Sequence, residues 1–169
     1  MGFLEKAKEL LIKHEGLKLK VYRCTAEKLT IGVGRNIEDN KFSREEIGVL
    51  FPGENLDQKT AELRVVKNGI NRLQSMYLLD NDLNAVVKDL RIIFREFDEY
   101  PENVKLALAS MRFNLGPAGF RKFKRMIANV KAGEYKVAAD EITSSKYAKQ
   151  VPNRAKDIMR LLKSAGRIE

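Results

Sequence analysis

The sequence predicts a mostly helical α+β protein with a small β-hairpin lobe, a long connecting helix and a helical C-terminal lobe. Apolar residues recur at three- and four-residue spacing through most of the chain, which is typical of amphipathic helices. Alternation of apolar and polar residues is convincing only in two neighbouring runs, 17–22 and 29–34, and this pattern predicts a single hairpin. The length of 169 residues is that of one ordinary domain.

The N-terminal elements can be placed from their start and stop signals. A helix is expected over residues 3–14, and Gly16 is a natural stop for it. After the hairpin, the capping box Ser43-Arg44-Glu45-Glu46 opens a short helix that ends near residues 51–53.

Asp57 is expected to cap a longer helix that ends at about Leu79 and spans roughly 30 Å at about 1.5 Å per residue. A helix of this length often bridges two lobes. We therefore expect one domain over residues 1–169, made of an N-terminal β-containing lobe (about 15–57), the connecting helix (about 58–79), and a C-terminal helical lobe (about 80–169 together with helix 3–14). Helices of the C-terminal lobe are expected at 82–95, 102–114, 117–131, 134–145 and 153–165.

Composition limits the chemistry. One histidine and one cysteine exclude an internal disulfide and most zinc, iron and copper sites, so we expect neither a metal nor another cofactor. Catalysis would have to use carboxylates, hydroxyls and one thiol. The net charge of +9 favours a polyanionic partner, such as nucleic acid, anionic lipid or the bacterial envelope, without choosing among them.

Targeting signals are not apparent. The first residues place charges among apolar positions at helical spacing, unlike a signal peptide, and no apolar run is long enough to cross a bilayer. The sequence therefore predicts synthesis in a cytoplasm, with no membrane anchor and no stable membrane insertion.

Glu15 is the most unusual acidic residue. It lies at the C-terminal end of the first predicted helix, where the helix dipole makes a carboxylate unfavourable by roughly 0.3–1 kcal/mol. A local rule broken at one residue hints at function. Taken alone, however, the position also fits a surface glutamate at a frayed helix end.

The hairpin places further polar groups together. Alternation predicts that Cys24 and Thr30 point to the same polar side of the two strands. Gly32 and Gly34 leave that side without side chains, so a ligand is expected to approach the backbone there. Individually, Thr30 is also an ordinary strand residue, and Cys24 an ordinary small hydrophobic residue.

Three blocks of the sequence resemble glycoside hydrolase family 24, the phage-type lysozymes. In the first block, Glu15, Cys24 and Thr30 fit the family pattern of a glutamate, eight residues, an aspartate or cysteine, five residues and a threonine. The other two blocks are Phe113-Asn114-Leu115-Gly116 with Ala118-Gly119-Phe120, and Pro152-Asn153-Arg154-Ala155 preceded by Tyr147 and Gln150.

The resemblance implies a two-lobed lysozyme-like fold that hydrolyses the β-1,4 bond between N-acetylmuramic acid and N-acetylglucosamine. It implies that Glu15 protonates the leaving oxygen, that Cys24 stands at the second catalytic position and that Thr30 helps to hold the attacking water. Arg154 resembles the arginine that supports the catalytic glutamate. The resemblance also implies glycan contacts for Asn36, Phe113 and Asn114.

Two positions depart from the common family pattern. Cys24 replaces an aspartate, so a thiolate acting as base or nucleophile, and hence an inverting or a retaining course, both stay open. Arg35 stands where a family member has a histidine in a stabilising ion pair; arginine is able to keep such a pair but does not titrate near neutral pH.

By analogy with the family, the partner is bacterial peptidoglycan. A monomer would accumulate in the host bacterial cytoplasm and reach the periplasm and wall after a holin opens the inner membrane. Two other functions remain open. One is an inactive lysozyme fold that binds walls. The other is a basic helical domain that binds nucleic acid through the runs 121–125 and 163–167. The family resemblance, in contrast, implies that nucleic acid is not a partner.

Overall fold

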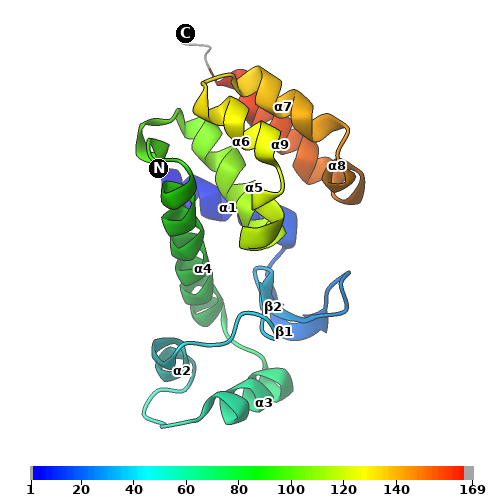
Figure 1. Cartoon of the computed structure of the whole chain (residues 1–169). Coiled ribbons are helices and arrows are strands. Elements are labelled where there is room, and N and C mark those ends of the chain that lie inside the picture. Colours follow the sequence, from blue (N-terminus) through cyan, green and yellow to red (C-terminus); the bar gives the residue numbers. More distant parts are fainter. Residues whose placement is uncertain (1, 166–169) are drawn as a thin grey trace. The chain divides into compact units, whose positions relative to one another are not determined.

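The computed structural model describes residues 2–165, which form two compact units (Figure 1). The β unit comprises Leu11–Asp82, and the helical unit comprises Met1–Leu10 with Leu83–Glu169. Helices dominate the described residues and one small antiparallel sheet accompanies them, so the predicted mostly helical α+β class is confirmed.

The β unit contains the end of helix α1, the whole sheet, two short helices and the start of α4. Its sheet has the order β1-β2-β3, with both pairs antiparallel. The first two strands form the predicted hairpin. The third strand has only two residues, too few for an alternation pattern to reveal. The elements are α1 (Phe3–Glu15), β1 (Lys18–Arg23), β2 (Leu29–Gly32), β3 (Arg35–Asn36), α2 (Arg44–Leu50), α3 (Gln58–Asn68) and α4 (Arg72–Ile93).

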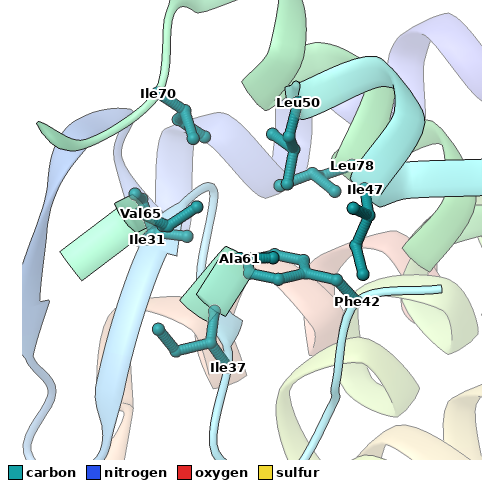
Figure 2. Packing of buried hydrophobic residues seen from close by; sticks show 9 residues of the cluster. All are labelled: Ile31, Ile37, Phe42, Ile47, Leu50, Ala61, Val65, Ile70 and Leu78. Carbon is teal, nitrogen blue, oxygen red and sulfur yellow. The ribbon is translucent and has the colours of Figure 1, made fainter. Parts of the chain in front are cut away.

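The β unit has its own hydrophobic core. Ile31 of β2 is fully buried and lies among apolar side chains from α2, α3 and α4 (Figure 2). Burying one such side chain contributes about 1.5–3 kcal/mol. The core therefore fixes β2, which carries part of the candidate site. The labelled cluster is Ile31, Ile37, Phe42, Ile47, Leu50, Ala61, Val65, Ile70 and Leu78.

Both predicted N-caps of this unit are present. The hydroxyl of Ser43 accepts a hydrogen bond from the backbone N–H of Glu46, and the Glu46 carboxylate accepts one from the N–H of Ser43, which completes the capping box of α2. The Asp57 carboxylate likewise accepts from the N–H of Thr60 at 2.8 Å and caps α3.

The continuous connecting helix predicted from about 58 to 79 is wrong. The structure has α3, a break at residues 69–71, and then the long helix α4 over Arg72–Ile93. At the break, Gly69 adopts φ 76°, and the N–H of Ile70 donates to the carbonyl of Leu19 on β1. Asn71 then accepts from the N–H of Gln74 and starts α4. The apolar periodicity continues across the break, and this continuity hid it.

The helical unit packs its helices against one another. Helix α5 (Glu102–Arg121) packs on α9 (Pro152–Ser164), which also packs on α7 (Tyr135–Thr143), and α7 contacts α6 (Lys124–Lys131) (Figure 1). A short 3-10 helix (η1, Phe97–Glu99) and helix α8 (Lys146–Gln150) complete it. Among residues 2–165, no helix is both long and apolar enough to cross a membrane.

The break predicted between helices 102–114 and 117–131 is present as a bend of α5 at Gly116, which has φ 70° and ψ 173°. The single helix predicted over 117–131 is wrong, because the arm of α5 after the bend ends at Arg121 and α6 begins at Lys124. Pro117 follows the bend directly, and its missing N–H explains why the bend lies here.

Candidate active site

The candidate acid, Glu15, is the last residue of α1 and lies next to two glycines. Gly16 adopts φ 74° and ends the helix. Gly34, after β2, adopts φ 69° and faces the Glu15 side chain. A Cβ atom on Gly34 would lie 2.9 Å from Cδ of Glu15 and 3.0 Å from its Oε2. A Cβ atom at this position would displace the Glu15 carboxyl group, and the positive φ of Gly34 disfavours any residue other than glycine.

The structure brings Cys24 and Thr30 together, as the alternation predicted. Cys24 directly follows β1 and is partly exposed, and its N–H donates to the carbonyl of Lys28 at 3.0 Å. Burial raises the pKa of the Cys24 thiol, but hydrogen bonds with the backbone of Ala26 and Lys28 and with the Thr30 side chain outweigh it and lower the pKa. A lowered pKa increases the thiolate fraction near neutral pH.

Thr30 itself is well buried, with 3% of its surface exposed. Its hydroxyl donates to the carbonyl of Lys28 at 3.0 Å. The hydroxyl has one proton, which it donates either to this carbonyl or to the Cys24 sulfur, and its oxygen keeps lone pairs that accept a hydrogen bond.

Tyr22 joins this group, although the sequence analysis gave it no role. It is paired with Thr30 across the two strands. Burial raises the pKa of the Tyr22 phenol first, and the negative charges of Glu15 and Cys24 raise it further. The ammonium of Lys18 lies 4.0 Å from the centre of the ring. Strand alternation, which puts Tyr22 and Cys24 on one face, was the signal that could have revealed it.

The space beside Gly32 is not open to a ligand, contrary to expectation. Gly32 is buried, and a Cβ atom there would lie 2.8 Å from the hydroxyl oxygen of Ser75 on α4. Ser75 is completely buried. Gly32 thus makes room for a core helix, and Gly34 makes room for Glu15.

Asn36 makes local bonds in the structure. Its side-chain oxygen accepts from the N–H of Glu38 at 2.9 Å and of Asp39 at 3.0 Å, and its amide donates to the Asp39 carboxylate at 2.8 Å. The side chain thereby closes the turn after β3. The backbone carbonyl of Asn36 accepts from the N–H of Asn40 at 3.1 Å, so the second amide N–H is what this residue retains for a glycan.

Arg35 occupies a buried polar cluster, and the pair expected of it is confirmed. Its guanidinium donates to Glu46 at 2.8 and 3.2 Å and to Asp82 at 2.6 Å. Asn40 also donates to Asp82, at 3.0 Å. Arg35 and Glu46 are almost fully buried. The cluster ties β3, α2 and the middle of α4 together and so fixes the strand that follows Gly34.

The remaining candidates belong to the helical unit. Phe113 is half-buried and Asn114 exposed, and both lie on α5 just before its bend at Gly116. Arg154 is buried in the first turn of α9, with 4% exposure. A cation is unfavourable in the first turn of a helix, so this buried arginine, like Glu15, breaks a local rule.

Metal chemistry finds no support in the described part of the chain. Within residues 2–165, no group of three or more histidine, cysteine, aspartate or glutamate side chains is placed to hold a metal ion. The chemistry available at the candidate site is that of one carboxyl, one thiol and two hydroxyl groups.

The candidate site thus combines an acid at a helix end, a glycine that faces this acid, and a thiol and a buried threonine from the hairpin. The model of the phage lysozyme family matches residues 12–160, and the chain belongs to this family. Two probable T4-type lysozymes of the amoeba Dictyostelium discoideum are similar to it. Number 2 is 28% identical over 156 residues, covering 90% of both chains, and number 1 is 24% identical over 163 residues, covering 93% of both.

Proposed function

We propose that the protein hydrolyses the β-1,4 bond between N-acetylmuramic acid and N-acetylglucosamine in bacterial peptidoglycan, with Glu15 as the general acid. The observation that carries this proposal is the close approach of Gly34 to the Glu15 carboxyl group in a chain of the lysozyme family, because it leaves room for an acid beside the hairpin. A positioned acid contributes about 10²–10⁴-fold to such a reaction.

Thr30 and Cys24 act on the water in this mechanism. The Thr30 oxygen accepts a hydrogen bond from the water, and the Cys24 thiolate takes its proton as it attacks the anomeric carbon. A thiolate that attacked the carbon itself would give a retaining reaction, whereas a thiolate acting as base gives inversion. The anomer first released therefore identifies the role of Cys24.

The helical unit completes the proposal. Phe113 and Asn114 contact the glycan, together with Asn36 of the β unit, and Arg154 supports the catalytic glutamate. The family model spans residues of both units, so we propose that residues 1–169 act as one lysozyme domain and as a monomer.

The biological role in the proposal is that of an endolysin. The protein would accumulate in the host bacterial cytoplasm and cause lysis once a holin gives access to the wall. The named relatives are probable T4-type lysozymes, which supports wall cutting, and the role in lysis follows by analogy with the phage family.

A nucleic-acid partner has less support because part of each basic run is engaged in ion pairs. Arg121 pairs with Asp89, and Arg125 pairs with Glu141 at 2.9 Å. In the second run, Lys163 pairs with Asp140 at 2.7 Å, while Gly166 and Arg167 lie outside the described residues. Each cation engaged in such a pair leaves one fewer to neutralise a phosphate.

The test is turbidity loss of outer-membrane-permeabilised Gram-negative cells, with Glu15→Gln compared with the wild type. Glu9→Gln is the matched control, since Glu9 is exposed on the same helix. We expect clearing by the wild type and Glu9→Gln, and at least about 10²-fold slower clearing by Glu15→Gln. Circular dichroism establishes that all three are folded.

The main alternative is an inactive module that binds walls, and the cysteine at position 24 is the observation that favours it. A folded wild type that sediments with purified walls but releases no reducing ends would support this alternative. Cys24→Asp, which restores the common family residue, would then be expected to gain activity.

A further inference from the structure

Helix α5 is weakened at the point where the proposed glycan-contacting residues lie. Gly116 leaves the helical conformation, and Pro117 offers no N–H to the carbonyl of Phe113. The arm that carries Phe113 and Asn114 is therefore joined to the arm ending at Arg121 by fewer helical hydrogen bonds than usual. Another contact must fix the angle between the two arms.

Asp89 of α4 supplies that contact. Its Oδ2 accepts from Nε of Arg112, which lies on the first arm beside Phe113. Its Oδ1 accepts from one terminal nitrogen of Arg121 on the second arm, and its Oδ2 accepts from the other at 3.0 Å. Arg121 also donates to the carbonyl of Pro117 at 3.1 Å. One carboxylate thus bridges the bend.

The bridge is partly shielded from solvent. The side chain of Asp89 is 16% exposed and that of Arg112 11%, whereas the Arg91–Asp98 pair of the same unit is exposed on both sides. Hydrogen bonding from Arg121 lowers the pKa of the Asp89 carboxyl, so it is ionised at neutral pH. Shielded, charge-assisted bonds hold geometry better than exposed ion pairs.

We propose that Asp89 is a positioning residue: by bridging Arg112 and Arg121 it sets the bend of α5 and so the direction in which Phe113 and Asn114 meet the glycan. This inference rests on the proposed function. The catalytic groups Glu15, Cys24 and Thr30 belong to the other unit, so disturbing Asp89 should impair glycan binding and leave the chemical step intact.

The test compares Asp89→Asn with Asp98→Asn, which removes the same charge from the exposed pair of the same unit. KM and kcat are measured on soluble peptidoglycan fragments. We expect Asp89→Asn to raise KM about tenfold, which corresponds to about 1.4 kcal/mol, and to change kcat by no more than about twofold. Asp98→Asn should leave both values unchanged.

A double-mutant cycle separates positioning from general destabilisation. Arg121→Gln serves as the second variant because the Arg121 side chain is 43% exposed, so this change is expected to leave the protein folded. Combined with Asp89→Asn, it should raise KM little further, since both changes break one bridge. Combined with Asp98→Asn, its effect should be unchanged. Additive effects of Asp89→Asn and Arg121→Gln would overturn the proposal.

The outcomes distinguish the two proposals. Equal KM values for folded Asp89→Asn and Asp98→Asn overturn the role of Asp89, while loss of clearing by Glu15→Gln still supports the proposed function. If the wild type cleaves nothing, the proposed function fails, and binding of an N-acetylglucosamine trimer decides on Asp89. Weaker binding by Asp89→Asn alone supports the role, and equal or absent binding overturns it.

Discussion

Replacing Asp82 by asparagine should change how stability depends on pH. Asp82 shares Arg35 with Glu46, and its side chain is only 12% exposed. Burial is the main cause that raises the pKa of Asp82 from 3.8 to about 6, and the charge of Glu46 raises it further, against Arg35 and Asn40, which lower it. Asparagine keeps the shape and an acceptor oxygen but removes the titration.

The magnitude of the change in unfolding free energy follows from the shift in the pKa of Asp82. A rise from 3.8 to about 6 corresponds to about 3 kcal/mol at about 1.36 kcal/mol per pH unit. Because the folded-state pKa of Asp82 is raised, its contribution to stability is complete below pH 3.8 and is lost as the pH rises through about 6. Between pH 7.5 and 4.5, the wild type should gain about 2 kcal/mol of unfolding free energy relative to Asp82→Asn.

Urea denaturation of the wild type and Asp82→Asn over this pH range gives the difference in unfolding free energy. Carboxyl NMR reports the Asp82 titration directly. Glu46 is the internal control. It accepts hydrogen bonds from Arg35, from Asn81 at 3.0 Å and from the N–H of Ser43 at 2.9 Å. Burial raises its pKa, but these donors outweigh burial and lower it. A stability difference that is constant over pH 4.5–7.5, or an Asp82 signal that titrates below pH 4, would refute the reasoning.

Two further substitutions test the frame of the site. Arg35→Met leaves buried carboxylates without their cation, so we expect a loss of about 3–5 kcal/mol of unfolding free energy in urea at pH 7.5; a loss below about 1 kcal/mol, as for an exposed pair, would contradict this. Gly34→Ala combines a positive φ with a Cβ contact of 2.9 Å to Glu15. We expect this substitution to lower the free energy of unfolding by about 1–3 kcal/mol and to slow wall clearing. Clearing at the wild-type rate would show that Glu15 tolerates displacement.

The local signals in the sequence were sufficient for most of the β unit. The capping box at Ser43 and the cap at Asp57 predicted the starts of α2 and α3, because capping depends on residues within one turn. Alternation along the two strands predicted that Cys24 and Thr30 point to the same side, and the structure places them in contact.

Contacts between distant segments were not predictable in the same way. The break at Gly69 depends on a hydrogen bond to Leu19, and the Asp89 bridge depends on two arginines far along the chain. Neither the hydrogen bond at Gly69 nor the Asp89 bridge changes the local periodicity of apolar residues. Gly69 itself was a visible signal, but a glycine inside an apolar helical pattern is often tolerated, so the pattern favoured continuity.

Gly32 and Gly34 each allow a close approach to the backbone, but different groups approach them. A glycine in a strand pattern indicates that something approaches the backbone closely, but not what approaches it. At Gly32 the approaching group is Ser75 from a core helix, and at Gly34 it is the carboxyl group of Glu15. The two positions look alike in sequence and serve different purposes, one in packing and one in holding the proposed acid. A substitution at Gly34 should therefore affect the reaction through Glu15, whereas one at Gly32 should affect the reaction only as far as it disturbs the core.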